Sequence, residues 1–192
     1  MDAFFHALGT VFASGAGVLL LAVAAGAIFL IGDWRTALAG VVVIHLGSAS
    51  LLVHVHNVSG IIAGGQVLAV ALSAAMLAIA GFLQPAGVSL HRAGNWPLRS
   101  LALLVVLAAW WFLDPGYTLP FLSQPETELL IWSGLCALAL WSFSGSPLLG
   151  GAAMLLWSTL LYAPAAVLLP NSGLVAIVGI ANLIAALACS YL

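Results

Sequence analysis

Charge is what this chain has least of. Its 192 residues include no lysine, and only 4% of them are charged, whereas a soluble domain carries about 25% charged residues. Hydrophobic residues make up 65% of the chain, and the mean hydropathy is +1.26. This composition excludes a soluble fold, because a domain of this size cannot bury so much apolar surface. The sequence predicts an all-α membrane protein in contact with the lipid bilayer.

Other scarce residues exclude further classes. The formal net charge of −2 offers no basic surface for nucleic acid. The two cysteines, Cys136 and Cys189, fall inside apolar stretches, which predicts small buried residues rather than a disulfide or a metal site. A signal peptide is not predicted, since the N-terminus lacks basic residues and its apolar run continues to Ile31. We expect a retained helix there.

Apolar stretches long enough for transmembrane helices follow one another along the chain. Such a helix needs about 20 mostly apolar residues, and unpaired backbone groups are not tolerated in hydrocarbon. By this rule the sequence predicts seven spans, at residues 8–31, 34–56, 59–83, 98–113, 126–144, 147–168 and 171–192. The connections are too short for a soluble domain, so we expect a single transmembrane domain over residues 1–192.

The few charges predict an orientation. The arginines, all at the two connections that follow the first and third spans, are Arg35, Arg92 and Arg99. Carboxylates dominate the opposite side, with Asp2, Asp114, Glu126 and Glu128, and only Asp33 shares the arginine side. By the positive-inside rule we expect the N-terminus outside and the C-terminus in the cytoplasm.

The two ends of the chain share a pattern. A shift of 113 residues aligns Gly32 with Gly145, and Ser59-Gly60 with Ser172-Gly173, without a gap. One interpretation is a 3+1+3 parallel repeat with halves 1–83 and 114–192 and a linker helix at 98–113, as in some transporters. The other interpretation is chance, because apolar helices align easily.

His45 lies near the middle of the second span. A charged group at that depth costs about 3 kcal/mol, so we expect His45 to be neutral and to face the protein interior. It could relay protons or contact a ligand. Alternatively, it makes an interhelical hydrogen bond, to Gln66 or Asn182 on other spans. We favour the hydrogen bond.

His6, His54 and His56 lie at the outer ends of the first two spans. A metal or haem at this face would need the imidazoles to converge. His54 and His56 are two residues apart and point to different faces of a helix, and no other histidine lies at the depth of His45. We therefore predict no cofactor, and interpret the outer histidines as interfacial polar anchors.

The spans offer little catalytic chemistry. They contain no paired carboxylates, no nucleophile beside a base and no metal-ligand spacing, so we do not expect an enzyme. They also lack the buried lysine or glutamate that a proton pump needs. Abundant small residues instead predict close helix packing, at Gly60, Gly64, Gly173 and Gly179. Pro164 should kink the sixth span.

The segments GLVAIVGIANLIAALACSYL (Gly173–Leu192) and GDWRTALA (Gly32–Ala39) resemble the small hydrophobic subunits encoded beside NADH-quinone-oxidoreductase-like and Mrp-type antiporter-like genes in bacteria. The chain departs from the K-type and C-type subunits of those complexes, whose intramembrane glutamates have no counterpart here. The resemblance implies an accessory or structural subunit of an ion-translocating complex in the bacterial inner membrane, with other integral membrane subunits as partners. It implies no catalytic residue.

A second interpretation remains open. The topology is also similar to that of the SWEET sugar carriers, with three helices, a linker and three more. The chain would then be a small solute transporter, with its site between the repeats near His45, Gln66, Asn182 and the Pro164 kink. We favour the accessory subunit, with His45 lining one side of a proton or quinone path.

Overall fold

The computed structural model describes residues 1–83, 96–113, 118–119, 121–169 and 172–191, and every regular element in these ranges is a helix. The helices are α1 (Asp2–Phe12), α2 (Gly15–Ile31), α3 (Trp34–His56), α4 (Gly60–Leu83), α5 (Trp96–Leu113), α6 (Gln124–Ser142), α7 (Pro147–Leu168) and α8 (Ser172–Tyr191). The predicted all-α architecture is confirmed. Arg92 and Asp114, which contributed to the predicted orientation, lie outside the described residues.

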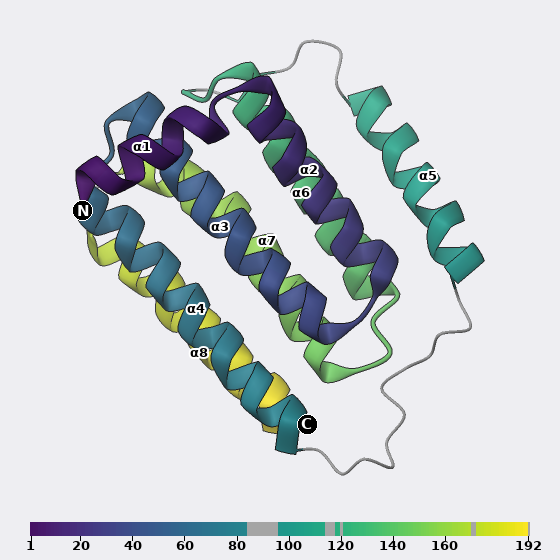
Figure 1. Ribbon diagram of the computed structural model, residues 1–192. Coiled ribbons are helices and arrows are strands. Elements are labelled where there is room, and N and C mark those ends of the chain that lie inside the picture. Colours follow the sequence, from purple (N-terminus) through teal and green to yellow (C-terminus); the bar gives the residue numbers. More distant parts are fainter. Residues whose placement is uncertain (84–95, 114–117, 120, 170–171, 192) are drawn as a thin grey trace.

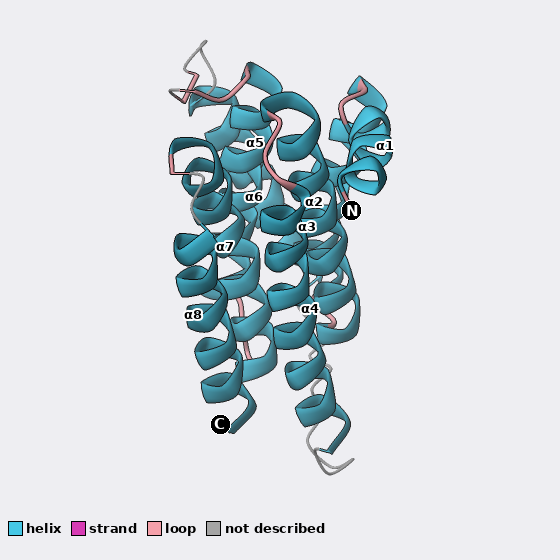
Figure 2. Cartoon of the chain, turned by 90° about the vertical axis from the view of Figure 1, so that its left-hand side faces the viewer, coloured by secondary structure: helices cyan, strands magenta, loops and turns pink. Residues whose placement is uncertain are grey.

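The helices form a two-layered bundle. α2, α3 and α4 make one layer and α6, α7 and α8 make the other, with α2 against α6, α3 against α7 and α4 against α8 (Figure 1). α5 packs outside the layers, against α2 and α6. Figure 2, turned by 90°, shows the long helices running along the bundle. The main hydrophobic core lies between the layers, where side chains such as Phe29, Leu77 and Leu155 are fully or almost fully buried.

The first predicted span is not one helix. α1 and α2 meet at an angle of 88°, so the prediction of a single helix over 8–31 is wrong. α1 ends at its C-cap Ala13. The next residue, Ser14, is the N-cap of α2, because its hydroxyl accepts a hydrogen bond from the Gly17 N–H at 3.1 Å. Gly17 lets the corner close, since a Cβ at this position would collide with the backbone of Val11 and Phe12.

After the corner, α1 lies across one end of the bundle and contacts both α3 and α4. The Asp2 carboxylate accepts a hydrogen bond of 2.7 Å from the backbone N–H of Gly60. Gly60 is the first residue of α4, where backbone N–H groups have no partner within the helix and a negative charge is favourable. α1 therefore caps α4 from outside.

Four helices are long and apolar enough to cross a membrane: α3, α4, α7 and, in α8, residues Gly173–Tyr191. The bent pair α1–α2 makes a fifth candidate if it counts as one span. The apolar part of α5, Trp96–Phe112, is shorter. α6 begins with Gln124, Glu126 and Glu128, which lower its hydropathy. By length and composition, the described residues thus provide four or five candidate spans.

The turn between α2 and α3 depends on a glycine and an arginine. Gly32 has φ +61°, the left-handed conformation that commonly ends helices. The Arg99 guanidinium of α5 occupies the space beside Gly32, where a Cβ would collide with it. Its Nη1 donates a hydrogen bond of 3.1 Å to the carbonyl of Phe29, one of the last carbonyls of α2. Arg99 thereby ties α5 to the end of α2.

The shift of 113 residues relates the bounds of α3 to those of α7. It moves Trp34–His56 to positions 147–169, and α7 is Pro147–Leu168. Corresponding helices run in the same direction, because the α2–α3 and α6–α7 connections lie at one end, where the Phe29 and Phe143 rings are 5.7 Å apart. A two-fold axis along the bundle would instead bring α2 against α8 and α4 against α6. The observed pairing (Figure 1) is not that of two-fold-related halves.

Candidate functional site

The three buried candidates from the sequence meet at the centre of the bundle. His45 comes from α3, Gln66 from α4 and Asn182 from α8. Their exposed fractions are 0%, 1% and 6%. Ser48 of α3, with Ser158 and Tyr162 of α7, completes a group that we name the central polar cluster. The central polar cluster thus has side chains from α3, α4, α7 and α8.

Both ring nitrogens of His45 are used. Its Nε2 lies 2.9 Å from the carbonyl oxygen of Leu155 on α7, and its Nδ1 lies 3.3 Å from the amide nitrogen of Gln66. A carbonyl can only accept, so Nε2 carries the proton, and Nδ1 accepts from the Gln66 amide. His45 is therefore neutral, and the hydrogen bond expected between His45 and Gln66 is present.

Among the described residues, hydrogen bonds connect Asn182 to His45 through Ser158. The Asn182 amide donates to the Ser158 hydroxyl at 3.0 Å, and that hydroxyl donates to the same Leu155 carbonyl at 2.7 Å. The edge of the Tyr162 ring meets the His45 ring, with centroids 5.8 Å apart at 90°. The Tyr162 hydroxyl faces Asn182 but forms no hydrogen bond in the described part of the chain.

Hydrogen bonds connect the members of the central polar cluster other than Tyr162. Each of its side chains is uncharged, and the hydrogen bonds from His45 and from Ser158 both end at one backbone carbonyl. A carbonyl oxygen accepts hydrogen bonds but has no proton to pass on. In this arrangement the hydrogen bonds link α3, α4, α7 and α8. Because His45 is fully enclosed, it does not lie on a surface that a neighbouring subunit could cover.

Sequence reasoning did not assign Ser48, Ser158 or Tyr162 to a site. A signal for Ser158 was nevertheless present, because Ser158 follows His45 by 113 residues, the same shift that aligns the two halves, and their side chains lie 3.5 Å apart. Ser48 lies one helical turn after His45, and its hydroxyl lies 3.4 Å from the Gln66 amide nitrogen. Tyr162 carried no comparable signal.

The outer histidines have separate partners. His6 of α1 faces His54 of α3, with their Nδ1 atoms 3.3 Å apart and the rings nearly perpendicular at 81°. The His56 Nε2 instead lies 3.0 and 3.1 Å from the two carboxylate oxygens of Glu126 on α6. No group of three or more metal-ligating side chains occurs in the parts of the chain that the structure describes.

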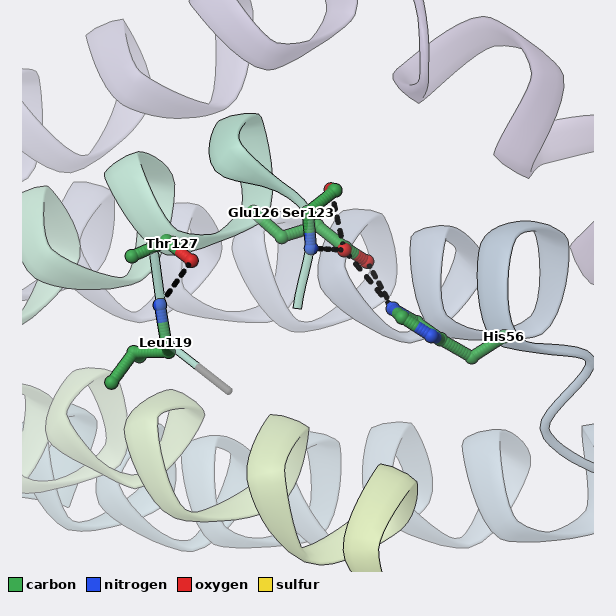
Figure 3. Close-up of polar contacts among 5 residues, drawn as sticks. All are labelled: His56, Leu119, Ser123, Glu126 and Thr127. Atoms are coloured by element: carbon green, nitrogen blue, oxygen red, sulfur yellow. Dashed lines mark hydrogen bonds and ion pairs between the residues drawn. The ribbon is translucent and has the colours of Figure 1, made fainter. Parts of the chain in front are cut away.

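Glu126 is the centre of the contacts at this end (Figure 3). Its Oε2 accepts from the backbone N–H of Ser123 at 2.9 Å and from the Ser123 hydroxyl at 2.6 Å, besides contacting His56. Nearby, the Thr127 hydroxyl accepts from the Leu119 N–H at 3.2 Å. Glu126, only 7% exposed, thus fixes the start of α6 and joins it to the end of α3.

Replacing Glu126 by glutamine is expected to lower the free energy of unfolding by about 1–2 kcal/mol, because charge-assisted hydrogen bonds become neutral ones. The measurement is denaturation in mixed micelles, followed by circular dichroism. Glu128→Gln is the matched control, since the hydrogen bond that its carboxylate accepts among the described residues comes from its helical neighbour Gln124, at 2.9 Å. Equal losses in the two variants would contradict a specific role for Glu126.

The glycines predicted to pack helices differ in their surroundings. A Cβ at Gly60 would meet Asp2, and a Cβ at Gly64 would come within 3.2 Å of the Met1 sulfur, so both glycines face α1 rather than a neighbouring span. At Gly179 a Cβ would lie 3.0 Å from the Ala69 Cβ, which brings α8 close to α4. Gly173 is exposed at the start of α8.

These features define an integral, multi-pass helical membrane protein with a neutral hydrogen-bonded core. Comparisons of the chain with protein-family models, with curated proteins and with solved structures found no match.

Proposed function

We propose that this chain is a non-enzymatic accessory subunit of a bacterial inner-membrane complex related to quinone-oxidoreductase or antiporter modules. The central polar cluster supports this role, because its members are uncharged and its hydrogen bonds connect His45, Gln66, Ser158 and Asn182 with one another. The charged residues among those described lie near helix ends instead. The described helices therefore offer an ion no charged residue in mid-membrane. The exposed apolar helices of the chain provide surface for lipid and for partner subunits.

The proposed topology has seven spans, with the bent α1–α2 pair as the first, and an outside N-terminus. α5 and α6 lie alongside α2 (Figure 1), and α5 enters the bundle from the end where Arg99 meets Gly32. Arg35 at the start of α3 lies at the same end, together with Asp33, while the carboxylates of Asp2, Glu126 and Glu128 lie at the other end. This separation of charge favours a cytoplasmic location for the arginine end.

A mild-detergent purification of the tagged protein from its native membrane tests the proposal. We expect mass spectrometry to find large antiporter-like or quinone-reductase subunits in the eluate, and deletion of the chain to lower the activity of that complex. A tagged multi-pass protein of similar size, purified in parallel, is the control for non-specific recovery. Recovery of the chain alone, as a monomer or a homodimer, would contradict an accessory role.

A small solute carrier is the second candidate, and the position of the central polar cluster favours it. Gln66, Ser158, Tyr162 and Asn182 bring amides and hydroxyls together between the layers, and Pro164 lies inside α7 two residues after Tyr162. These groups suit an uncharged polar solute. The protein reconstituted alone in liposomes would then transport such solutes, and Asn182→Leu would abolish uptake. Transport by the pure chain would favour this candidate over the accessory subunit.

A further inference from the structure

A groove runs between α3 and α4 at the arginine end of the bundle. It has a volume of about 390 Å³, and its apolar wall includes Leu38 and Val42 of α3 and Ala71, Ala75 and Ala78 of α4. From Arg35 to Val42 is seven residues, or about 10 Å along a helix. The groove is therefore a short, open apolar groove on the side of the bundle, and no member of the central polar cluster lines it.

Arg35, the second residue of α3, lines one end of this groove. Its guanidinium carbon lies 5.3 Å from the centroids of both the Trp34 and the Phe82 rings, within the range of cation–π attraction. Those rings meet edge to face, with centroids 5.2 Å apart. The aromatic pair thus holds the guanidinium at the mouth of the groove.

The charge of Arg35 is available to a ligand. Among the described residues no carboxylate forms an ion pair with it, although Asp33 precedes it by two residues. Arg35 is an exposed residue, so a ligand can reach it. A planar guanidinium is well suited to bind the oxygens of a phosphate.

We propose that this groove is a binding site for an anionic phospholipid. The lipid phosphate contacts the Arg35 guanidinium, and one acyl chain lies along the alanine wall of α4. The Arg35 cation at one end of an apolar groove matches an amphiphile with a negatively charged headgroup. Basic pockets between transmembrane helices bind such headgroups. A transmembrane helix in the same groove would have to carry a carboxylate to pair with Arg35. This proposal does not depend on the proposed function.

Native mass spectrometry of the full chain in detergent tests the site, with added phosphatidylglycerol and phosphatidylcholine of identical acyl chains as probes. We expect one phosphatidylglycerol to be retained in preference to phosphatidylcholine. Arg35→Gln should lower phosphatidylglycerol retention about fivefold, because one cation near the membrane surface contributes about 1 kcal/mol to anionic-lipid binding. Circular dichroism checks that each variant is folded.

A second variant tests the channel separately from the charge. Ala75→Leu fills the groove while Arg35 remains, and we expect it to reduce the retention of both lipids. Ala188→Leu, at an exposed position of α8 away from the groove, is the matched control and should leave retention unchanged. Equal retention of the two lipids by the wild-type chain would overturn the proposal, as would unchanged phosphatidylglycerol retention in both groove variants. Photo-crosslinking from position 75 to a protein rather than to lipid would also overturn it.

Discussion

Replacing His45 by leucine is expected to lower the free energy of unfolding by about 1–3 kcal/mol. The substitution removes two interhelical hydrogen bonds, to Gln66 at 3.3 Å and to the Leu155 carbonyl at 2.9 Å. Each such bond within a membrane contributes about 0.6–1.7 kcal/mol. The loss leaves the Gln66 amide buried with only its long contact to Ser48, at 3.4 Å, and an unpaired buried polar group is costly.

Titration with a denaturing detergent, followed by circular dichroism, measures this effect. Ser73→Ala is the control, because the Ser73 hydroxyl is equally buried but donates only to its own helix, at the Ala69 carbonyl. We expect a smaller loss for Ser73→Ala. The double variant His45→Leu/Gln66→Leu should lose less than the sum of the two single variants, since the two side chains interact. Strict additivity would mean that the hydrogen bond between His45 and Gln66 contributes nothing.

Replacing Gly17 by alanine is expected to displace α1 from the end of the bundle, at a cost of about 3 kcal/mol. A Cβ at Gly17 would meet backbone atoms of Val11 and Phe12, which cannot move aside as a flexible side chain can. Overpacking commonly costs about 1–3 kcal/mol, and a backbone collision should fall at the upper end. The substitution should therefore open the 88° corner between α1 and α2.

Cross-linking follows this displacement directly. In a chain with Cys136→Ala and Cys189→Ala, the pair His6→Cys and His54→Cys reports the contact between α1 and α3, where the two native rings lie 5.4 Å apart. We expect a short bis-maleimide to join the pair, and Gly17→Ala to lower the yield several-fold. Gly15→Ala is the matched control, because no atom lies within 4 Å of a Cβ at that position. An unchanged yield in Gly17→Ala would show that the corner tolerates a side chain.

The sequence predicted the central helices closely. The expected span 34–56 is α3, 147–168 is α7, and 59–83 differs from α4 by one residue. These bounds could be predicted from the sequence because each long apolar run begins or stops at a residue that commonly caps or ends helices. Pro147 follows the cap Ser146 at the start of α7, and Asn57 ends α3 in the left-handed conformation, with φ 53°.

The bend between α1 and α2 at Ser14 was missed. A long apolar run predicts that a segment lies in lipid, but it does not predict whether the segment forms one straight helix. Ala13, Ser14 and Gly15 lie inside a run that is otherwise long enough to cross a membrane. The deciding contacts are distant in sequence: Asp2 caps Gly60, and His6 meets His54. The partner of His56 was missed for the same reason, since Glu126 lies 70 positions away.

By itself, the sequence determined that the chain is a helical membrane protein, which buried polar residues it holds, and where most of its helices begin and end. Length and hydropathy are sufficient for this, because hydrocarbon requires each span to satisfy its own backbone hydrogen bonds. Only the tertiary structure decided which faces meet. Lipid tails are as apolar as leucine, so hydrophobicity does not separate inner from outer faces: Ile61 is 70% exposed while its neighbour Ile62 is 9% exposed. Packing and interhelical hydrogen bonds determine which helix faces are buried. They also place Gln66, Ser158 and Asn182 around His45.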